Sequence, residues 1–344
     1  MSAARAGGTT RVSAVDPTRP FRWQDGDRLV LFGRGILDQA RAELGSGYAL
    51  LTTPRAAAAA PALTEGAGNV HEVARGRVDE LAAELRPGLG SELLVALGGG
   101  RVIDVAKALA AADPPRRVAA VPTTLSGAEM TAIHRHASGV PLDAPRTRPV
   151  IVINDPVLSA SQPLAELAAS AANALGHAAE GPLTPLTSPL PSLAALEAAR
   201  LIARGLADPE RPDRDARALA ALLAGYVIGS TGYGLHHVLS QTLVRFAGLG
   251  HGQANAIMLP HALVALARRE PDRIAALGEA LEEEPGRFAA RLAALARAGT
   301  LGDAGVPADA LDGLAEQAAT RAELRMTPPP ADRRELLELL RAAY

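Results

Sequence analysis

Strand and helix patterns alternate through the first 155 residues of the chain, and helix patterns alone follow. Strands are predicted at Arg28–Phe32, Tyr48–Thr52, Glu92–Leu97, Val118–Val121 and Val150–Ile153. Helices are predicted between them at Ile36–Leu44, Val73–Leu85 and Val102–Ala111. Because helix-length connections join parallel strands, this half of the chain predicts an α/β domain with a parallel sheet.

The alternation stops near Asp155-Pro156, where Ala- and Leu-rich helices begin. We therefore expect a flexible N-terminal tail at 1–20, an α/β nucleotide-binding domain at 21–155 and an all-helical catalytic domain at 156–344. The length of 344 residues is sufficient for two domains with separate cores.

Composition excludes several classes of protein. The net charge of −2 and the aromatic content of 3% argue against nucleic-acid binding. The chain has no Cys, and no apolar run approaches the roughly 20 residues that span a bilayer. We expect a cytoplasmic protein whose partner is a small molecule, with neither nucleic acid nor membrane as a partner.

Two loops with phosphate-binding character follow predicted strands. Gly98-Gly99-Gly100 ends one strand and opens a helix, where glycines allow close approach of the backbone and free N–H groups attract anions. Thr123 and Thr124 follow the next strand. Ligands of open α/β sheets bind at the carboxyl ends of strands. The two loops therefore predict a phosphate-bearing ligand, although neither matches the GxGxxG or Walker pattern.

Polar residues in otherwise apolar predicted helices indicate a second candidate site. Asn173, His177 and Glu180 share one helix face at i, i+4 and i+7, and His237 and His251 follow on later helices. A lone His on such a face is usually a packed core residue, but three His with an Asn favour a site. Asn173 stands where an acidic residue would complete a divalent-metal cage with the three His, so that set of four lacks its negative charge. The set therefore belongs either to an enzyme that works without a metal or to a homologue whose fold serves a different function.

The chain resembles the iron-containing alcohol dehydrogenase superfamily, and within it the maleylacetate reductases. The resemblance runs from Phe21 to Tyr344 and rests on motifs at Phe32–Gly35, Gly98–Lys107, Pro122–Glu129, Asn154–Pro156 and Pro260–His261, with Gly234–His237 and Thr327–Pro330 favouring the reductase branch. It implies a dehydroquinate synthase-like architecture, in which a Rossmann-like domain precedes an all-α domain. It also implies NADH or NADPH as cofactor and a homodimer.

The resemblance assigns roles residue by residue. Metal-dependent members bind their ion with one Asp and three His at the positions of Asn173, His177, His237 and His251; maleylacetate reductases have Asn, as this chain does, so we expect no metal. Gln241 stands where the family usually places a further His near the nicotinamide, and we include it with these four as catalytic. The expected cofactor-binding residues are Thr53, Gly98, Gly99, Gly100, Arg101, Asp104, Lys107, Thr123 and Thr124. The candidate substrate residues are His134, His136 and His236, with Arg135 and Arg146 as further candidates for binding a substrate carboxylate.

The resemblance implies a metal-independent NAD(P)H-dependent reductase of a carbonyl or enone substrate that bears a carboxylate. Arg55 and the absence of an acid near Thr53 are compatible with NADPH. Two alternatives stay open at this point. One is a repurposed homologue that uses its histidines as acid and base in a dehydration, lyase or cyclisation step of a biosynthetic pathway. The other is a non-catalytic interaction protein, which no sequence feature favours.

Overall fold

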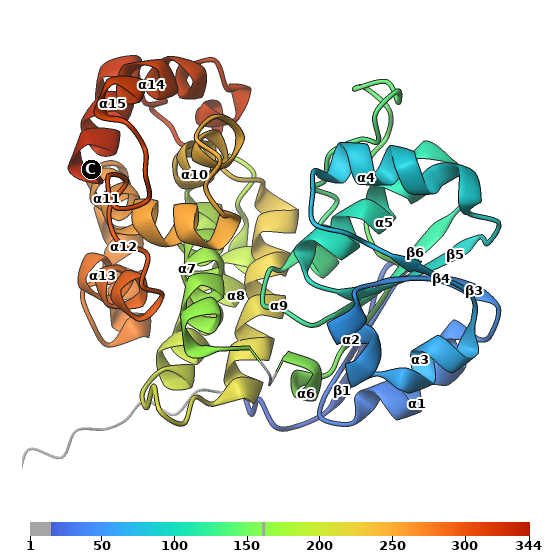
Figure 1. Cartoon of the computed structure of the whole chain (residues 1–344). Coiled ribbons are helices and arrows are strands. Elements are labelled where there is room, and N and C mark those ends of the chain that lie inside the picture. The colour runs from blue at the N-terminus through green and yellow to red at the C-terminus, as the bar shows by residue number, and fades with distance from the viewer. Residues whose placement is uncertain (1–14, 160–161) are drawn as a thin grey trace, which may run out of the picture.

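The computed structural model describes residues 15–159 and 162–344, which form an α/β half and a helical half side by side (Figure 1). The predicted tail at 1–20 falls mostly outside the described residues. The last strand ends at Asn154 and the first helix of the second half begins at Pro156, next to the predicted domain break.

A seven-stranded sheet forms the first half, in the order β1-β2-β7-β6-β5-β3-β4. Only β1 and β2 pair antiparallel; all other neighbours are parallel. The strands are β1 (Phe21–Asp25), β2 (Arg28–Phe32), β3 (Tyr48–Thr52), β4 (Ala67–Glu72), β5 (Leu93–Gly98), β6 (Arg117–Pro122) and β7 (Ile151–Asn154). The predicted parallel sheet is thus confirmed, with β1 and β4 added at its two edges.

Alternate residues of each strand pack on opposite faces of the sheet. Leu51, Leu94 and Ala96 lie against one group of helices, whereas Leu50 and Val95 lie against the other. The first face is covered by α4 (Val78–Leu85) and α5 (Gly100–Ala112), and the second by α1 (Ile36–Leu44), α2 (Pro54–Ala59) and α3 (Pro61–Gly66). The chain therefore leaves neighbouring strands β3 and β5 toward opposite faces, which opens a crevice at their carboxyl ends.

The second half contains helices packed around α7, and its core extends to Val30 and Val152 of the sheet. Its helices are α6 (Pro156–Ser159), α7 (Leu164–Glu180), α8 (Pro189–Gly205), α9 (Arg214–Thr231), α10 (Leu235–Phe246), α11 (His251–Arg269), α12 (Pro271–Leu281), α13 (Pro285–Leu295), α14 (Leu311–Ala319) and α15 (Arg333–Ala342). Small residues let these helices approach closely: a Cβ on Gly181 would lie 2.3 Å from Val227 of α9. In Figure 1, α9 lies on the side of this half that faces the sheet.

Among the described residues, no single helix has the length and apolar composition of a membrane span. The bent pair formed by α9 and α10 meets that test only when the two are taken together across a 99° break, and most of their residues are buried in the helical core.

Candidate active site

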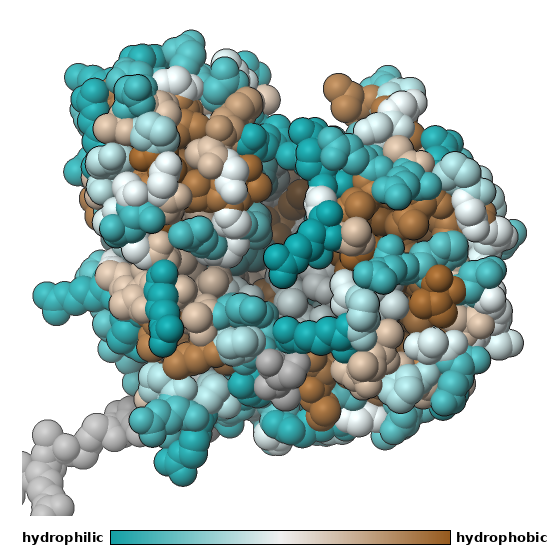
Figure 2. Space-filling view, in the orientation of Figure 1, coloured by the Kyte–Doolittle hydropathy of each residue, from teal (hydrophilic) through white to brown (hydrophobic). Residues whose placement is uncertain are grey.

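A cleft between the two halves contains a cavity of about 860 Å³ (Figure 2). Hydrophilic side chains line much of its rim. A second cavity of about 310 Å³ adjoins it, because Gly100, Arg101 and Thr124 line both. The smaller cavity lies at the crevice between β3 and β5, and the larger one extends from there to the histidines of the helical half.

The glycine turn after β5 shapes the junction of the two cavities. A Cβ on Gly99 would lie 3.0 Å from Thr124, and one on Gly100 would lie 3.0 Å from Ser126, so the turn is narrow enough that only glycine leaves it open. The first N–H groups of α5 are directed into this turn, and its first turn carries no acidic residue. This arrangement fits the diphosphate of a dinucleotide. The residues that would hold a nicotinamide cofactor are therefore present.

Most of the predicted cofactor residues line these cavities. Thr53, Gly99, Gly100, Arg101, Thr123 and Thr124 line the smaller cavity, and Asp104 lines the larger one. Gly98 ends β5 instead, where a Cβ would lie 2.6 Å from Val102 of the next helical turn. Thr53 also caps α2 by accepting a hydrogen bond from Ala56 N at 3.3 Å.

Lys107 is fully buried and lies beneath the cavity wall. Its Nζ donates to the carbonyl oxygens of Ala128 (3.0 Å), Thr131 (3.2 Å) and Ile133 (2.8 Å). It also pairs with Asp104 at 2.8 Å. Lys107 therefore fixes the loop that follows β6, and any effect on the cofactor passes through that loop.

This loop presents alternate residues to the cleft. Ile133 and Arg135 line the cavity, whereas His134 and His136 are buried on the other side of the loop. His134 lies 2.8 Å from the carbonyl oxygen of Arg135 through Nδ1 and accepts from Thr147 N at 3.2 Å through Nε2. Burial lowers the pKa of His134 to about 4. The structure thus does not bring the predicted substrate residues His134 and His136 to the cavity, nor Arg146, whereas the candidate Arg135 does line it.

The four residues expected from the histidine pattern do converge. Asn173 and His177 lie one turn apart on α7, His237 lies in the first turn of α10, and His251 begins α11; all four line the cavity. The rings of His177 and His237 are stacked with centroids 4.7 Å apart. Burial lowers the pKa of His177 well below its ordinary value, with a further contribution from His237. His251 is exposed to the cleft.

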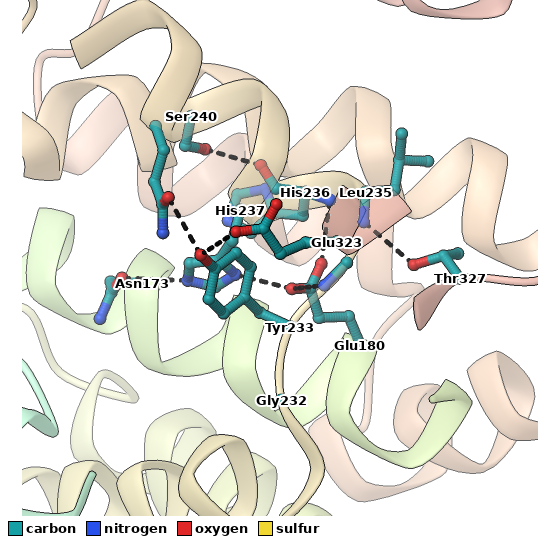
Figure 3. Close-up of polar contacts among 12 residues, drawn as sticks. Asn173, Glu180, Gly232, Tyr233, Leu235, His236, His237, Ser240, Glu323 and Thr327 are labelled. Carbon is teal, nitrogen blue, oxygen red and sulfur yellow. Dashed lines mark hydrogen bonds and ion pairs between the residues drawn. The ribbon is translucent and has the colours of Figure 1, made fainter. Parts of the chain in front are cut away.

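Glu180, one turn beyond His177, fixes the orientation of His237 (Figure 3). Its carboxylate is fully buried and accepts hydrogen bonds from Gly234 N at 2.7 Å and His236 N at 2.9 Å. The same carboxylate lies 2.9 Å from His237 Nδ1. Since both carboxylate oxygens already accept backbone N–H groups, Nδ1 carries the proton and donates it to Glu180. Burial raises the pKa of Glu180 and lowers that of His237 to about 3.

The unprotonated Nε2 of neutral His237 is therefore directed toward the cleft. Asn173 Oδ1 lies 3.4 Å from it, and the Asn173 amide is held in this orientation because Nδ2 donates to Ser126 O at 3.2 Å. Asn173 Oδ1 can accept a hydrogen bond from His237 Nε2 only when Nε2 gains a proton. Glu180 and Asn173 thus stabilise the protonated ring at its two ends, which suits His237 to proton exchange.

His236 lies behind this site. Its side chain is fully buried, and its ring packs edge-on against His237 with centroids 4.7 Å apart. A Cβ on Gly176 would lie 2.6 Å from the His236 ring, so the two helices meet there closely. Burial lowers the pKa of His236 to about 3. The structure therefore places His236 in the packing behind His237 and not at the cavity.

Gln241 lines the cavity one turn after His237 and belongs to a network that the sequence did not reveal. Arg321 Nη2 donates to Gln241 Oε1 at 3.0 Å, and the Tyr233 hydroxyl lies 3.3 Å from the same oxygen. Glu323 holds Arg321 at 2.9 Å and accepts from the Tyr233 hydroxyl at 3.0 Å. Despite partial burial, the hydrogen bond from Arg321 holds the pKa of Glu323 at about 2.

The donor set at His177, His237 and His251 does not fit a resident divalent ion. Among the described residues, no three His, Cys, Asp or Glu side chains converge in an arrangement that could hold a metal. Asn173 contributes a neutral amide, and the nearby carboxylate of Glu180 is occupied by Gly234, His236 and His237. A buried divalent charge would lack the anionic ligand that ordinarily balances it.

Comparisons with known proteins agree with this architecture. Residues 167–344 match the model of the Fe-containing alcohol dehydrogenase family, C-terminal. The maleylacetate reductase of Rhizobium sp. (strain MTP-10005) is 31% identical, covering 95% of this chain and 98% of the relative. Maleylacetate reductase 2 of Cupriavidus pinatubonensis is 36% identical over 77% of this chain and 76% of its own length.

Solved structures give the same result. The crystal structure of maleylacetate reductase from Agrobacterium tumefaciens superposes with a TM-score of 0.80 at 28% identity, covering 95% of this chain and 98% of that one. An iron-containing alcohol dehydrogenase from Thermotoga maritima shares the fold, with a TM-score of 0.73 at 23% identity over 91% of this chain and 97% of that one. The chain is therefore an oxidoreductase that belongs to the iron-containing alcohol dehydrogenase family, in the branch that contains the maleylacetate reductases.

Proposed function

We propose that this enzyme reduces a carbonyl or enone substrate that bears a carboxylate, with NADH or NADPH as hydride donor and without a metal. The observation that supports this most directly is the placement of His237. Its Nε2 is directed into the cleft opposite the glycine turn, while Glu180 and Asn173 hold the ring. Maleylacetate, which the relatives' names give as their substrate, is the first compound to test.

In this proposal the smaller cavity holds the phosphates of the cofactor, and the larger cavity holds the nicotinamide and the substrate. Gly99, Gly100 and Arg101 would hold the diphosphate, and Arg55 in the smaller cavity suits the 2′-phosphate of NADPH. A nicotinamide held there would supply hydride to the electrophilic carbon of the substrate. A proton must also reach the substrate to complete the reduction; solvent is its source, and His237 Nε2 is placed to take it up and pass it to the substrate.

Stabilisation of the substrate oxygen falls to hydrogen-bond donors in place of a metal. Charge that develops on this oxygen during hydride transfer is stabilised by fixed donors in the cleft. These donors would be the amide of Gln241 and His237 once its Nε2 has gained a proton; the two residues lie one helical turn apart on α10 and both line the cavity. The metal-free mechanism, the homodimer and the cytoplasmic location remain predictions.

The proposal is tested by two measurements on the purified protein. NADH and NADPH are titrated against the protein by nicotinamide fluorescence, and oxidation of the bound cofactor by maleylacetate is then followed by absorbance. We expect saturable binding and substrate-dependent oxidation. Absence of binding for both cofactors would refute the reductase. Binding without oxidation by maleylacetate or other oxo acids would favour a non-redox reaction.

A further inference from the structure

One face of α10 presents hydrogen-bond donors to the cleft in successive turns. His237, Gln241 and Arg245 lie at i, i+4 and i+8, and all three line the cavity. His237 and Gln241 already have roles in the proposed reaction, so Arg245 is the one without an assigned role. Their positions extend from the centre of the cavity to its exposed mouth, where Arg245 lies at the end of the helix.

The orientation of the Gln241 amide is fixed by its neighbours. A guanidinium group only donates hydrogen bonds, so the atom that faces Arg321 Nη2 at 3.0 Å is the amide oxygen. Arg321 is itself held by Glu323 through Nε at 3.1 Å and Nη2 at 2.9 Å. The amide Nε2 has no hydrogen-bond partner in the described part of the chain. Gln241 therefore offers a fixed N–H donor to a molecule in the cavity.

Arg245 and Arg135 place two cations at the mouth of the cavity, one from each half of the molecule. Within residues 15–159 and 162–344, Arg245 has no carboxylate within ion-pair distance. Burial lowers its pKa, and the charges of Arg321 and Arg135 lower it further. Arg135 is 36% exposed, and its nearest acid, Asp79, is 3.7 Å away.

The acids on and beside the cavity wall do not balance this charge. Asp104 pairs with Lys107 at 2.8 Å, and Asp79 pairs with Arg77 at 2.7 Å. Glu166 lines both cavities and so lies toward the cofactor end. A region of unbalanced positive charge beside a fixed amide donor is suited to an anionic substrate group.

We propose that Arg245 and Arg135 bind a carboxylate of the substrate, and that Gln241 donates a hydrogen bond to a neighbouring substrate oxygen. The inference rests on the proposed function, which it makes more specific: the substrate is an oxo acid whose carboxylate bridges the helical half and the α/β half. This arrangement orients the reacting carbon between His237 and the glycine turn. Neutral carbonyl compounds of the same size lack this anchor and are poor substrates.

The test uses adipate, a saturated six-carbon dicarboxylate, as an unreactive probe. Its affinity for the intact protein with bound NADP⁺ is measured by calorimetry in wild type, Arg245→Gln, Arg135→Gln and Gln241→Leu. Arg268→Gln, an exposed arginine change outside both cavities, is the matched control. Because hydrogen bonds to charged groups contribute roughly 1.5–3 kcal/mol, we expect either arginine variant to weaken adipate binding about tenfold to a hundredfold. We expect a smaller loss in Gln241→Leu.

Several results would overturn the inference. The first is that wild type shows no saturable adipate binding. The second is that both arginine variants lose no more adipate affinity than Arg268→Gln does. The third is that the arginine variants lose as much NADPH affinity as adipate affinity, which would assign these arginines to the cofactor phosphates. Reduction of maleylacetate by the same variants separates the two proposals. Arginine-dependent adipate binding without any reduction would refute the proposed function alone, whereas reduction with unchanged KM in both variants would refute this inference alone.

Discussion

Replacement of Glu180 by Gln tests the arrangement around His237 most sharply. Gln has the same shape but replaces one carboxylate oxygen by an NH2 group. The Glu180 carboxylate is fully buried and accepts from Gly234 N, His236 N and His237 Nδ1. In either orientation of the new amide, at least one of these buried donors faces another donor. An unsatisfied buried donor costs about 1–3 kcal/mol, which is the expected loss in the free energy of unfolding.

The same substitution changes the proton on His237. When the new NH2 faces Nδ1, the ring takes the other tautomer, and no carboxylate remains to stabilise the ring with both nitrogens protonated, so uptake and release of a proton at Nε2 are lost. General acid–base groups contribute roughly 10²–10⁴-fold to rate, and we expect kcat to fall within this range while NADPH affinity is unchanged.

The assays are cofactor oxidation with maleylacetate, urea unfolding, and ¹⁵N chemical shifts of the histidine rings, which report the tautomer directly. Glu338→Gln is the matched control, because that side chain is 63% exposed. A Glu180→Gln variant that is as active and as stable as Glu338→Gln, with His237 still protonated at Nδ1, would refute the reasoning.

Three further predictions concern other parts of the site. His237→Ala should abolish reduction without unfolding the protein, whereas His71→Ala on edge strand β4 should retain activity; an active His237→Ala would remove the proposed proton exchange. Gly99→Ala places a methyl group 3.0 Å from Thr124 and should raise the NADPH dissociation constant about tenfold with little change in stability, as measured by fluorescence titration. Burial raises the pKa of Glu129 from 4.5 to about 7, so the folded state binds more protons than the unfolded state between these values. The free energy of unfolding should therefore fall by about 3 kcal/mol as pH rises from 4.5 to 7, and Glu129→Gln should remove this dependence in urea unfolding curves.

The interior of the sheet was predictable from sequence, and its edges were not. Strands β2, β3, β5, β6 and β7 are apolar runs because helices cover both of their faces. Edge strands β1 and β4 are largely exposed and have mixed composition, so no periodic pattern marks them. The helix predicted at Val73–Leu85 begins only at Val78, because Val73 still pairs with β3 through a hydrogen bond from its N–H to Thr52 O and Gly76 has a φ of +156°.

The candidate site was predictable where local spacing determined it. Asn173 and His177 share a helix face, and the glycine turn follows a strand directly. Of the candidates on this loop, His134 and His136 are turned away from the cleft, whereas Arg135 and its neighbour Ile133 line it. A one-residue difference in an extended segment reverses the direction of the side chain.

Long-range partners could not be read from one chain. Arg321 and Glu323 lie some 80 residues after Gln241, in the short turn η5 (Ala322–Met326) and just before it, and no motif connects them. Glu180 had a sequence signal in its i+7 position on α7, but its partners at the start of α10 depend on helix packing.

The central claim is that His237, Glu180 and Asn173 support hydride transfer without a metal. The most direct measurement is NADPH oxidation by maleylacetate with protein that has been dialysed against chelator and assayed for metal content. We expect metal-stripped protein to retain its full activity and added Zn²⁺ or Fe²⁺ not to increase it. Activity that disappears with the metal and returns with stoichiometric Zn²⁺ or Fe²⁺ would contradict the account.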